Sequence, residues 1–302
     1  MEFGFRYDIT SWTHNATWSP RFNLAHTFGE RTTLRAGWGH FYQTQGLHDL
    51  NVQDGDASFY PAELAKHLIV GLELRFSDAL FMRLDVYQKD KSRLRPRYVN
   101  LNGDATNLFP EAGLYNRVRV QPSSGEAKGV EISLRRQSKG KLNGWLSYSL
   151  ARAEDTIDGL AIPKSFDQRH TLYADLNYRP SSRFSINIAW QYHSGWRYSD
   201  LDIELVRIPG ASPFYRSHWG RMNALEFPAY HRLDVRISRH FQFSQTALAA
   251  FLEVRNAYNR RNIRVHNYQL INQPDDSVLM IPEPRGWLPI LPAFGLRWDF
   301  HH

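Results

Sequence analysis

Apolar and polar residues alternate along much of the chain with the period of two that a β-strand requires. In the stretch 230–241, YHRLDVRISRHF, the apolar side chains fall on one face of a strand and most of the charged ones on the other. The pattern predicts about twelve strands of roughly ten residues each. Their expected spans are 2–9, 20–28, 32–42, 66–76, 79–90, 126–138, 143–152, 168–179, 183–193, 230–241, 246–257 and 292–300.

The connections between these strands alternate between short and long. The short ones carry the Gly, Pro, Ser or Asp of tight turns. The long ones are expected to be irregular, and they cover residues 43–65, 91–125, 153–167, 194–229 and 258–291. A meander with short turns at one end and long loops at the other gives this alternation, which is typical of an outer-membrane β-barrel with tight periplasmic turns and long extracellular loops.

We therefore predict an all-β fold, an antiparallel up-and-down transmembrane β-barrel of about twelve strands. In such a barrel the apolar face of each strand contacts lipid and the polar face lines a wet lumen. The charges expected to face the lumen are Glu73, Arg75, Arg83, Asp85, Arg232, Asp234 and Arg236. Arg136 and Arg239 fall on the apolar face, but next to short turns, where a long side chain can reach the interface.

Composition excludes further classes of protein and of binding site. No run of apolar residues approaches the roughly 18 of a membrane helix, and a chain without cysteine forms neither a disulfide nor a thiolate metal site. The formal net charge of +7 fits an anionic partner. Because the sequence has no Lys-rich run, zinc spacing or RNA-recognition signature, we expect lipid headgroups or an anionic solute, and no nucleic acid.

The two ends of the chain lead to further expectations. The N-terminal MEFGFRYDIT begins inside a strand-like alternation and lacks the pattern of a signal peptide, so we expect part of a longer protein. The last predicted strand ends on an aromatic residue and resembles the signal read by the barrel assembly machinery, through Phe294, Leu296, Trp298 and Phe300. His301 and His302 follow as a tail, and adjacent histidines on opposite faces of a strand form no metal site.

No motif points to catalysis or to a metal centre, and we expect neither an enzyme nor a bound cofactor. No serine has the G-x-S-x-G context of a nucleophile elbow, and the H-E-x-x-H metal motif is absent from the sequence. Asp167, Arg169 and His170 stand where a long loop enters a strand, and we expect them to fix the start of that strand. The basic segment 91–99, KSRLRPRYV, is expected to contact lipid headgroups.

The long loop at 195–222 is the best candidate for binding a ligand. It combines aromatic side chains, which offer flat apolar contact, with arginines, whose forked donors match carboxylate or phosphate groups. This combination suits an anionic, partly aromatic metal chelate, and contact with the headgroup region is the alternative. The candidate residues are Trp196, Arg197, Tyr198, Tyr215, Arg216, Trp219 and Arg221.

In order and spacing, five stretches resemble the C-terminal part of the barrel of a TonB-dependent outer-membrane receptor. They are AKGVEISLRR (127–136), SFDQRHTLYADLNYRP (165–180), GRMNALEFPAYHRLDVRISRHF (220–241), LEVRNAYNRRN (252–262) and LPAFGLRWDF (291–300). The resemblance extends over nearly the whole chain and is most diffuse near its start.

The resemblance implies that residues 1–300 are a portion of a barrel of about 22 strands with a plugged lumen, in the outer membrane of a Gram-negative cell. Such receptors import a scarce solute, such as a ferric siderophore or another metal chelate, with energy transmitted through TonB. The plug, the TonB box and the signal peptide would lie outside this chain. TonB would then act only through that missing region, and the chain alone is expected not to transport.

The other partners expected from this resemblance are outer-membrane lipid, lipopolysaccharide and the barrel assembly machinery. Two alternatives stay open. One is a passive porin-like barrel in the same membrane, and the other is a soluble β-rich binding protein.

Overall fold

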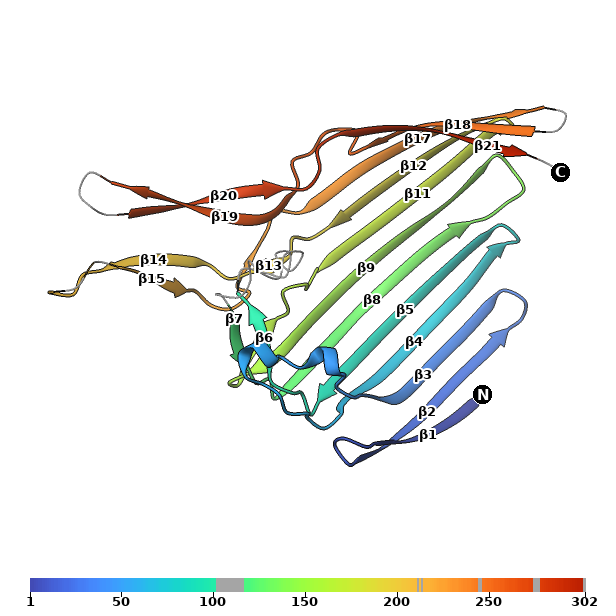
Figure 1. Ribbon diagram of the computed structural model, residues 1–302. Helices are drawn as coiled ribbons and strands as arrows, with labels where there is room; N and C mark the ends of the chain where they lie inside the picture. Colours follow the sequence, from blue (N-terminus) through green and yellow to red (C-terminus); the bar gives the residue numbers. More distant parts are fainter. Residues whose placement is uncertain (102–116, 211, 213, 244–245, 274–277, 301–302) are drawn as a thin grey trace.

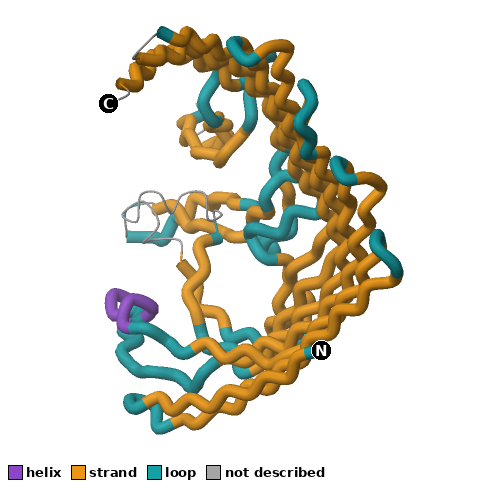
Figure 2. The backbone as a smooth tube through the Cα atoms, turned by 90° about the vertical axis from the view of Figure 1, so that its right-hand side faces the viewer, coloured by secondary structure: helices purple, strands orange, loops and turns teal. Residues whose placement is uncertain are grey.

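The structure is a computed structural model that describes residues 1–101, 117–210, 212, 214–243, 246–273 and 278–300. Its main element is one curved sheet (Figures 1 and 2) in which every strand is antiparallel to its neighbours. The sheet follows chain order through β1 (Glu2–Thr10), β2 (Asn15–Phe28), β3 (Thr32–Gln43), β4 (Glu63–Ser77), β5 (Leu80–Ser92), β8 (Ser124–Arg136), β9 (Leu142–Ile157), β11 (His170–Ser181), β12 (Phe184–His193), β17 (Tyr230–Gln242), β18 (Thr246–Arg255) and β21 (Leu291–Phe300).

All twelve predicted strands are present, and their up-and-down order is confirmed. β1 and β21 form the two edges of the described sheet, which is open between them (Figure 2). The strands run past their predicted ends mainly on the side of the long loops, where β2 begins at Asn15 and β9 continues to Ile157. The connection between β1 and β2 is therefore a short turn at residues 11–14, and the predicted alternation does not extend to this first connection.

The prediction that the long connections are irregular is wrong. They contain the paired strands β6 (Arg97–Asn100) and β7 (Arg117–Val120), β13 (Arg197–Tyr198) and β16 (Leu225–Glu226), β14 (Leu201–Val206) and β15 (Phe214–Trp219), and β19 (Ile263–Asn272) and β20 (Val278–Gly286), as well as β10 (Leu160–Pro163) beside β9. The hairpins β14–β15 and β19–β20 extend away from the sheet at its long-loop end (Figure 1).

Helical structure is limited, in the part of the chain that the structure describes, to two single turns of 3-10 helix, η1 (Leu47–Asp49) and η2 (Val52–Asp54). Among these residues, no helix has both the length and the apolar character needed to cross a membrane. The tail at 301–302 lies outside the described residues.

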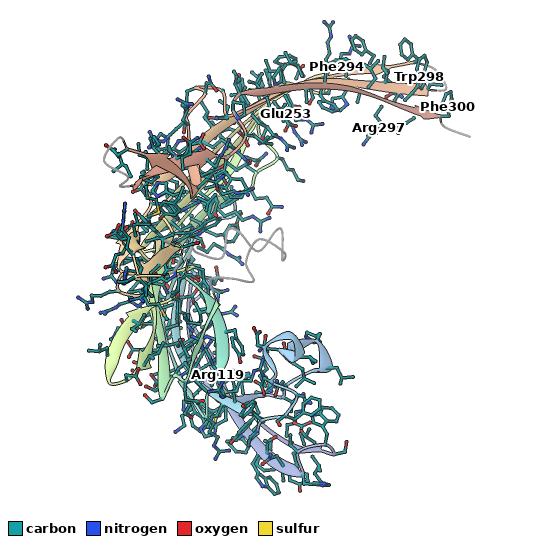
Figure 3. All side chains as sticks on the ribbon, turned by 60° about the vertical axis from the view of Figure 1, so that its left-hand side comes forward. Arg119, Glu253, Phe294, Arg297, Trp298 and Phe300 are labelled. Atoms are coloured by element: carbon teal, nitrogen blue, oxygen red, sulfur yellow. The ribbon has the colours of Figure 1, made fainter. Side chains whose placement is uncertain are left out.

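The sheet has an apolar convex face and a polar concave face. Figure 3 shows Phe294 and Trp298 on the convex side of β21, whereas Arg297 and Glu253 point to the concave side. The strand register aligns residues of the same face on neighbouring strands, so the convex and concave sides keep this difference from β21 to β4. The large apolar side chains that are exposed on the convex face include Leu68, Val70, Val86, Val130, Ile132, Leu146, Leu176, Ile188, Ile237 and Leu252. So continuous an apolar surface is what contact with lipid requires.

Buried apolar residues lie instead at the long-loop end. Leu64 at the start of β4 and Ile157 at the end of β9 are buried, as are Leu94 and Phe227 in the connections. The packed interior of this protein therefore joins the loop strands to the ends of the sheet. It holds the loops in a defined arrangement over the sheet.

Candidate ligand-binding site at the long-loop end

Charged side chains on the concave face form a network across neighbouring strands. Glu73 on β4 stands opposite Arg83 on β5, and Arg35 on β3 donates to Glu73 at 2.8 Å. Arg83 Nε also donates to Asp85 Oδ2 at 2.6 Å. Gly71 makes room for this carboxylate, because a Cβ there would lie 2.4 Å from Asp85 Oδ1. These charges neutralise one another on the concave face.

A second charged group lies on β17 and β18. Arg232 pairs with Asp234 at 2.8 Å, and Arg236 Nη1 lies 3.5 Å from Glu253 Oε2. Register places these residues on the same concave face as the first group. The seven charges for which a lumen-facing position is predicted lie on the concave face by register: Glu73, Arg75, Arg83, Asp85, Arg232, Asp234 and Arg236.

Part of the predicted loop cluster comes together at the base of the loops. The Trp196 ring lies 6.0 Å from that of His193 and meets Trp287 edge-on, also at 6.0 Å between centroids. Tyr198 stacks on Phe227 at 4.2 Å. These contacts make Trp196 and Tyr198 structural members of an aromatic cluster that joins several connections.

The other predicted loop residues lie elsewhere. Arg197 on β13 pairs with Glu226 on β16 at 3.4 Å and lies 3.8 Å from Asp167, so its charge is satisfied within the loops. The hairpin β14–β15 and the turn after it carry the remaining candidates, Tyr215, Arg216, Trp219 and Arg221. Because that hairpin extends away from the sheet (Figure 1), the seven candidates do not form one site.

His266 on β19 connects the second hairpin to the aromatic cluster. Its ring lies edge-on to Tyr198 at 5.3 Å and to Phe227 at 5.0 Å. Burial lowers the pKa of His266 and thereby favours its neutral form. Burial, and then the nearby Asp200 carboxylate, raise the pKa of the Tyr198 hydroxyl. The contact between the hairpin and the loop base is therefore formed by uncharged rings.

The segment around Asp167 ties β9 to the start of β11. Asp167 Oδ1 accepts a hydrogen bond from the Ala153 N–H at 2.7 Å. The His170 ring nitrogen Nδ1 lies 2.9 Å from the Tyr148 hydroxyl. These contacts hold the strand start, the role expected for this segment.

A cavity of about 220 Å³ lies at the long-loop end, between β6, β9, β10 and the turn after β15. Asp155 in its wall is 1% exposed. Its carboxylate contacts Arg97 on β6 and also Lys164, the latter at 2.6 Å. Gly125 stands opposite Asp155, and a Cβ there would lie 2.5 Å from Oδ1. Two cations and one carboxylate leave these three side chains with a formal charge of +1.

Unsatisfied acceptors and aromatic rings complete the cavity. Oδ1 of Asp155 and Oδ1 of Asn223 are buried and accept no hydrogen bond from the described residues. Tyr98 and Phe166 line the same space, and the Lys164 ammonium lies 5.9 Å from the centre of the Phe166 ring. Buried acceptors in a polar cavity are normally satisfied by water or by a ligand donor. The cavity thus offers cations, acceptors and flat apolar surface within a small volume.

Sequence reasoning missed this cavity. Arg97 lies in the basic segment 91–99, which was expected to contact headgroups, and that expectation is wrong for Arg97 because its guanidinium binds Asp155. Asp155 and Lys164 belong to no recognisable motif. The Arg97–Asp155 pair joins positions 58 residues apart, so only the fold brings the three side chains together.

The residues predicted to signal barrel assembly share the convex face of the edge strand β21. Phe294, Leu296, Trp298 and Phe300 are between 57% and 85% exposed, and the rings of Trp298 and Phe300 stack at 6.0 Å. Their placement on one face agrees with the alternation in the sequence.

Comparison with known proteins identifies similar chains. The family model described as TonB dependent receptor-like, beta-barrel matches residues 1–257. A search of curated protein sequences found no match. Solved structures similar to this chain include a mutant of the ferric enterobactin receptor of Pseudomonas aeruginosa in complex with enterobactin, with a TM-score of 0.58 and 15% identity over 98% of this chain and 42% of that one.

Two further structures show the same likeness. The ferripyoverdine receptor of the outer membrane of Pseudomonas aeruginosa has a TM-score of 0.56 and 13% identity over 94% of this chain and 33% of that one. The outer membrane transporter YddB of Escherichia coli has a TM-score of 0.57 and 11% identity over 97% and 43%. At these identities the likeness concerns the fold, and this chain spans 33% to 43% of the length of these three structures.

Proposed function

Because this chain belongs to the TonB-dependent receptor-like β-barrel family and has the fold of outer-membrane receptors, we propose that it forms part of an active importer for an anionic metal chelate such as a ferric siderophore. It is an outer-membrane β-barrel chain, and its family is one of receptors and transporters. TonB supplies the energy, in this proposal, through contacts made outside residues 1–302. These residues alone do not drive uptake.

The observation that carries the proposal is the cavity around Asp155. Its fixed carboxylate holds the Arg97 guanidinium and the Lys164 ammonium side by side in the wall of the cavity. The oxygens of an anionic chelate would accept hydrogen bonds from these cations, and charge-assisted bonds of this kind are the stronger ones. An aromatic part of the chelate would lie against Tyr98 and Phe166.

In this proposal the chelate passes along the concave face of the sheet. The paired charges around Glu73 and Arg236 would line a wet lumen, because a polar interior is the rule for such barrels. The metal ion is cargo carried by the chelate. The proposal therefore assigns neither a catalytic residue nor a resident cofactor to this chain.

Ligand titration of the outer-membrane protein that contains this chain tests the proposal. A ferric catecholate chelate should quench its tryptophan fluorescence, and Lys164→Gln should weaken the affinity about tenfold, as expected for the loss of one hydrogen bond to a charged group. Arg285→Gln is the matched control, because Arg285 lies on the outer hairpin and is 58% exposed. Equal affinities for the two variants would overturn the assignment of the cavity.

The porin alternative makes a different prediction, and the family match does not favour it. A passive barrel would admit the chelate at a rate that does not depend on the proton-motive force. We expect uptake by the protein containing this chain to stop when the inner membrane is de-energised.

A further inference from the structure

A second hollow lies on the convex face, on the side of the sheet that faces lipid. It is an open groove of about 360 Å³ that crosses β8, β9, β11 and β12. Its walls are almost entirely apolar and include Leu134, Leu142, Leu146, Leu176, Ile188 and Trp190. Nothing in the proposed import function uses this groove.

Strand register explains why the hollow exists. Gly144 stands between Arg136 on β8 and Leu176 on β11, at a position where its neighbours along the strand carry large side chains. It has to be small, because a Cβ there would lie 2.4 Å from the Asp175 carbonyl oxygen. Ala174, on the adjacent strand β11, is a second small residue. The two small residues leave a gap in an otherwise continuous apolar surface.

The groove runs from the short-turn rim of the sheet into the apolar band. Arg136 is the last residue of β8 and stands at that rim, where its Nε donates to the Leu142 carbonyl at 3.3 Å. The opposite end of the groove reaches Trp190 on β12. A chain-like apolar group lying in the groove would thus have one end at a guanidinium and the other end in the hydrocarbon.

The neighbouring turns add positive charge at the same rim. Residues 137–141 read QSKGK and residues 180–183 read PSSR, so these two turns contain bases and no carboxylate, whereas the turn before the groove residue Leu80 carries one acid, Asp78. In an outer-membrane barrel the short turns face the periplasm, and the lipid at that depth is the phospholipid of the inner leaflet. Basic groups beside an apolar groove at headgroup depth are complementary to anionic lipid.

We propose that this groove binds an anionic phospholipid of the periplasmic leaflet. One acyl chain lies over Gly144 and Ala174, and the phosphate is bound by Arg136. Lys139 and Lys141 in the adjoining turn strengthen the attraction without being required to touch the lipid. The site is independent of the chelate cavity, which lies at the other end of the sheet.

Native mass spectrometry of the membrane-assembled protein in detergent tests this proposal. The probes are phosphatidylglycerol and phosphatidylethanolamine with identical acyl chains. We expect one phosphatidylglycerol to be retained about tenfold more strongly than phosphatidylethanolamine, the ratio that one additional charge-assisted hydrogen bond gives. Arg136→Gln should remove that preference, and Ala174→Phe should fill the groove and lower the retention of both lipids.

Ala250→Phe is the matched control, because Ala250 faces Leu296 on the convex side of β18, outside the groove. It should leave lipid retention unchanged. Equal retention of the two lipids by the native protein, or an unchanged preference in Arg136→Gln, would overturn the proposal. Retention of a lipopolysaccharide mass in place of a glycerophospholipid would overturn it as well. Because Arg136 is exposed, Arg136→Gln should assemble normally. Its lipid preference therefore tests the proposal even if Ala174→Phe fails to assemble.

Discussion

Replacing Asp155 with asparagine removes the carboxylate between two cations at the loop-end cavity. The Asp155 side chain is 2% exposed, that of Lys164 13% and that of Arg97 34%. Removing one partner of a buried ion pair costs about 3–5 kcal/mol, because the other charge stays buried. Solvent screens part of this penalty at Arg97, so we expect the free energy of unfolding to fall by about 2–3 kcal/mol.

Urea unfolding of the protein in detergent micelles, followed by tryptophan fluorescence, measures this loss. With a slope of about 2 kcal/mol per molar urea, the midpoint should fall by roughly 1 M. Asp8→Asn is the matched control, because Asp8 pairs with Arg6 in an exposed position on β1, where an ion pair contributes little. Adding Lys164→Met to Asp155→Asn should restore part of the stability, because it removes an ammonium that has lost its contact with the Asp155 carboxylate. Equal losses for Asp155→Asn and Asp8→Asn would refute the reasoning.

Two further predictions concern the last strand and the β19–β20 hairpin. Phe300→Ala should lower the folded fraction in the outer membrane, measured by heat-dependent gel migration, whereas Phe243→Ala in a short turn should not; equal yields would exclude the terminal aromatic from assembly. Because the pKa of His266 is lowered by burial, its contribution to packing is complete above about pH 6.5 and is lost as pH falls toward the lowered pKa. Proteolysis of the hairpin should therefore accelerate below that pH in the native protein and not in His266→Phe; a pH-independent native rate would contradict this.

The twelve strands of the sheet could be predicted because their pattern is local. β17 spans Tyr230–Gln242, against a prediction of 230–241, since its alternation reflects lipid on one side and polar groups on the other. β9 was predicted to end at 152 and continues to Ile157. There the outward positions are occupied by Arg152 and Glu154, which pair with each other. A strand that has left the hydrocarbon keeps its backbone pairing but loses its apolar signature.

The loop strands and the cavity could not be predicted in the same way. β20 contains Pro282 and Pro284, and a two-stranded ribbon tolerates proline where no partner needs an N–H. The loop residues share a composition but not a location, because the hairpin β14–β15, which contains Arg216, extends away from the sheet (Figure 1). The Arg97–Asp155 contact depends on where β6 lies relative to β9, which no local pattern encodes.

The central claim is that the convex face contacts lipid and the concave face contacts water. Because the chain has no cysteine, a single spin label can be placed at Ile132→Cys or at Ser133→Cys, adjacent positions on opposite faces of β8. In membranes, the label at 132 should be relaxed by oxygen, which partitions into lipid, and the label at 133 by a water-soluble nickel complex. The reverse accessibility, or equal accessibility at both positions, would contradict the account.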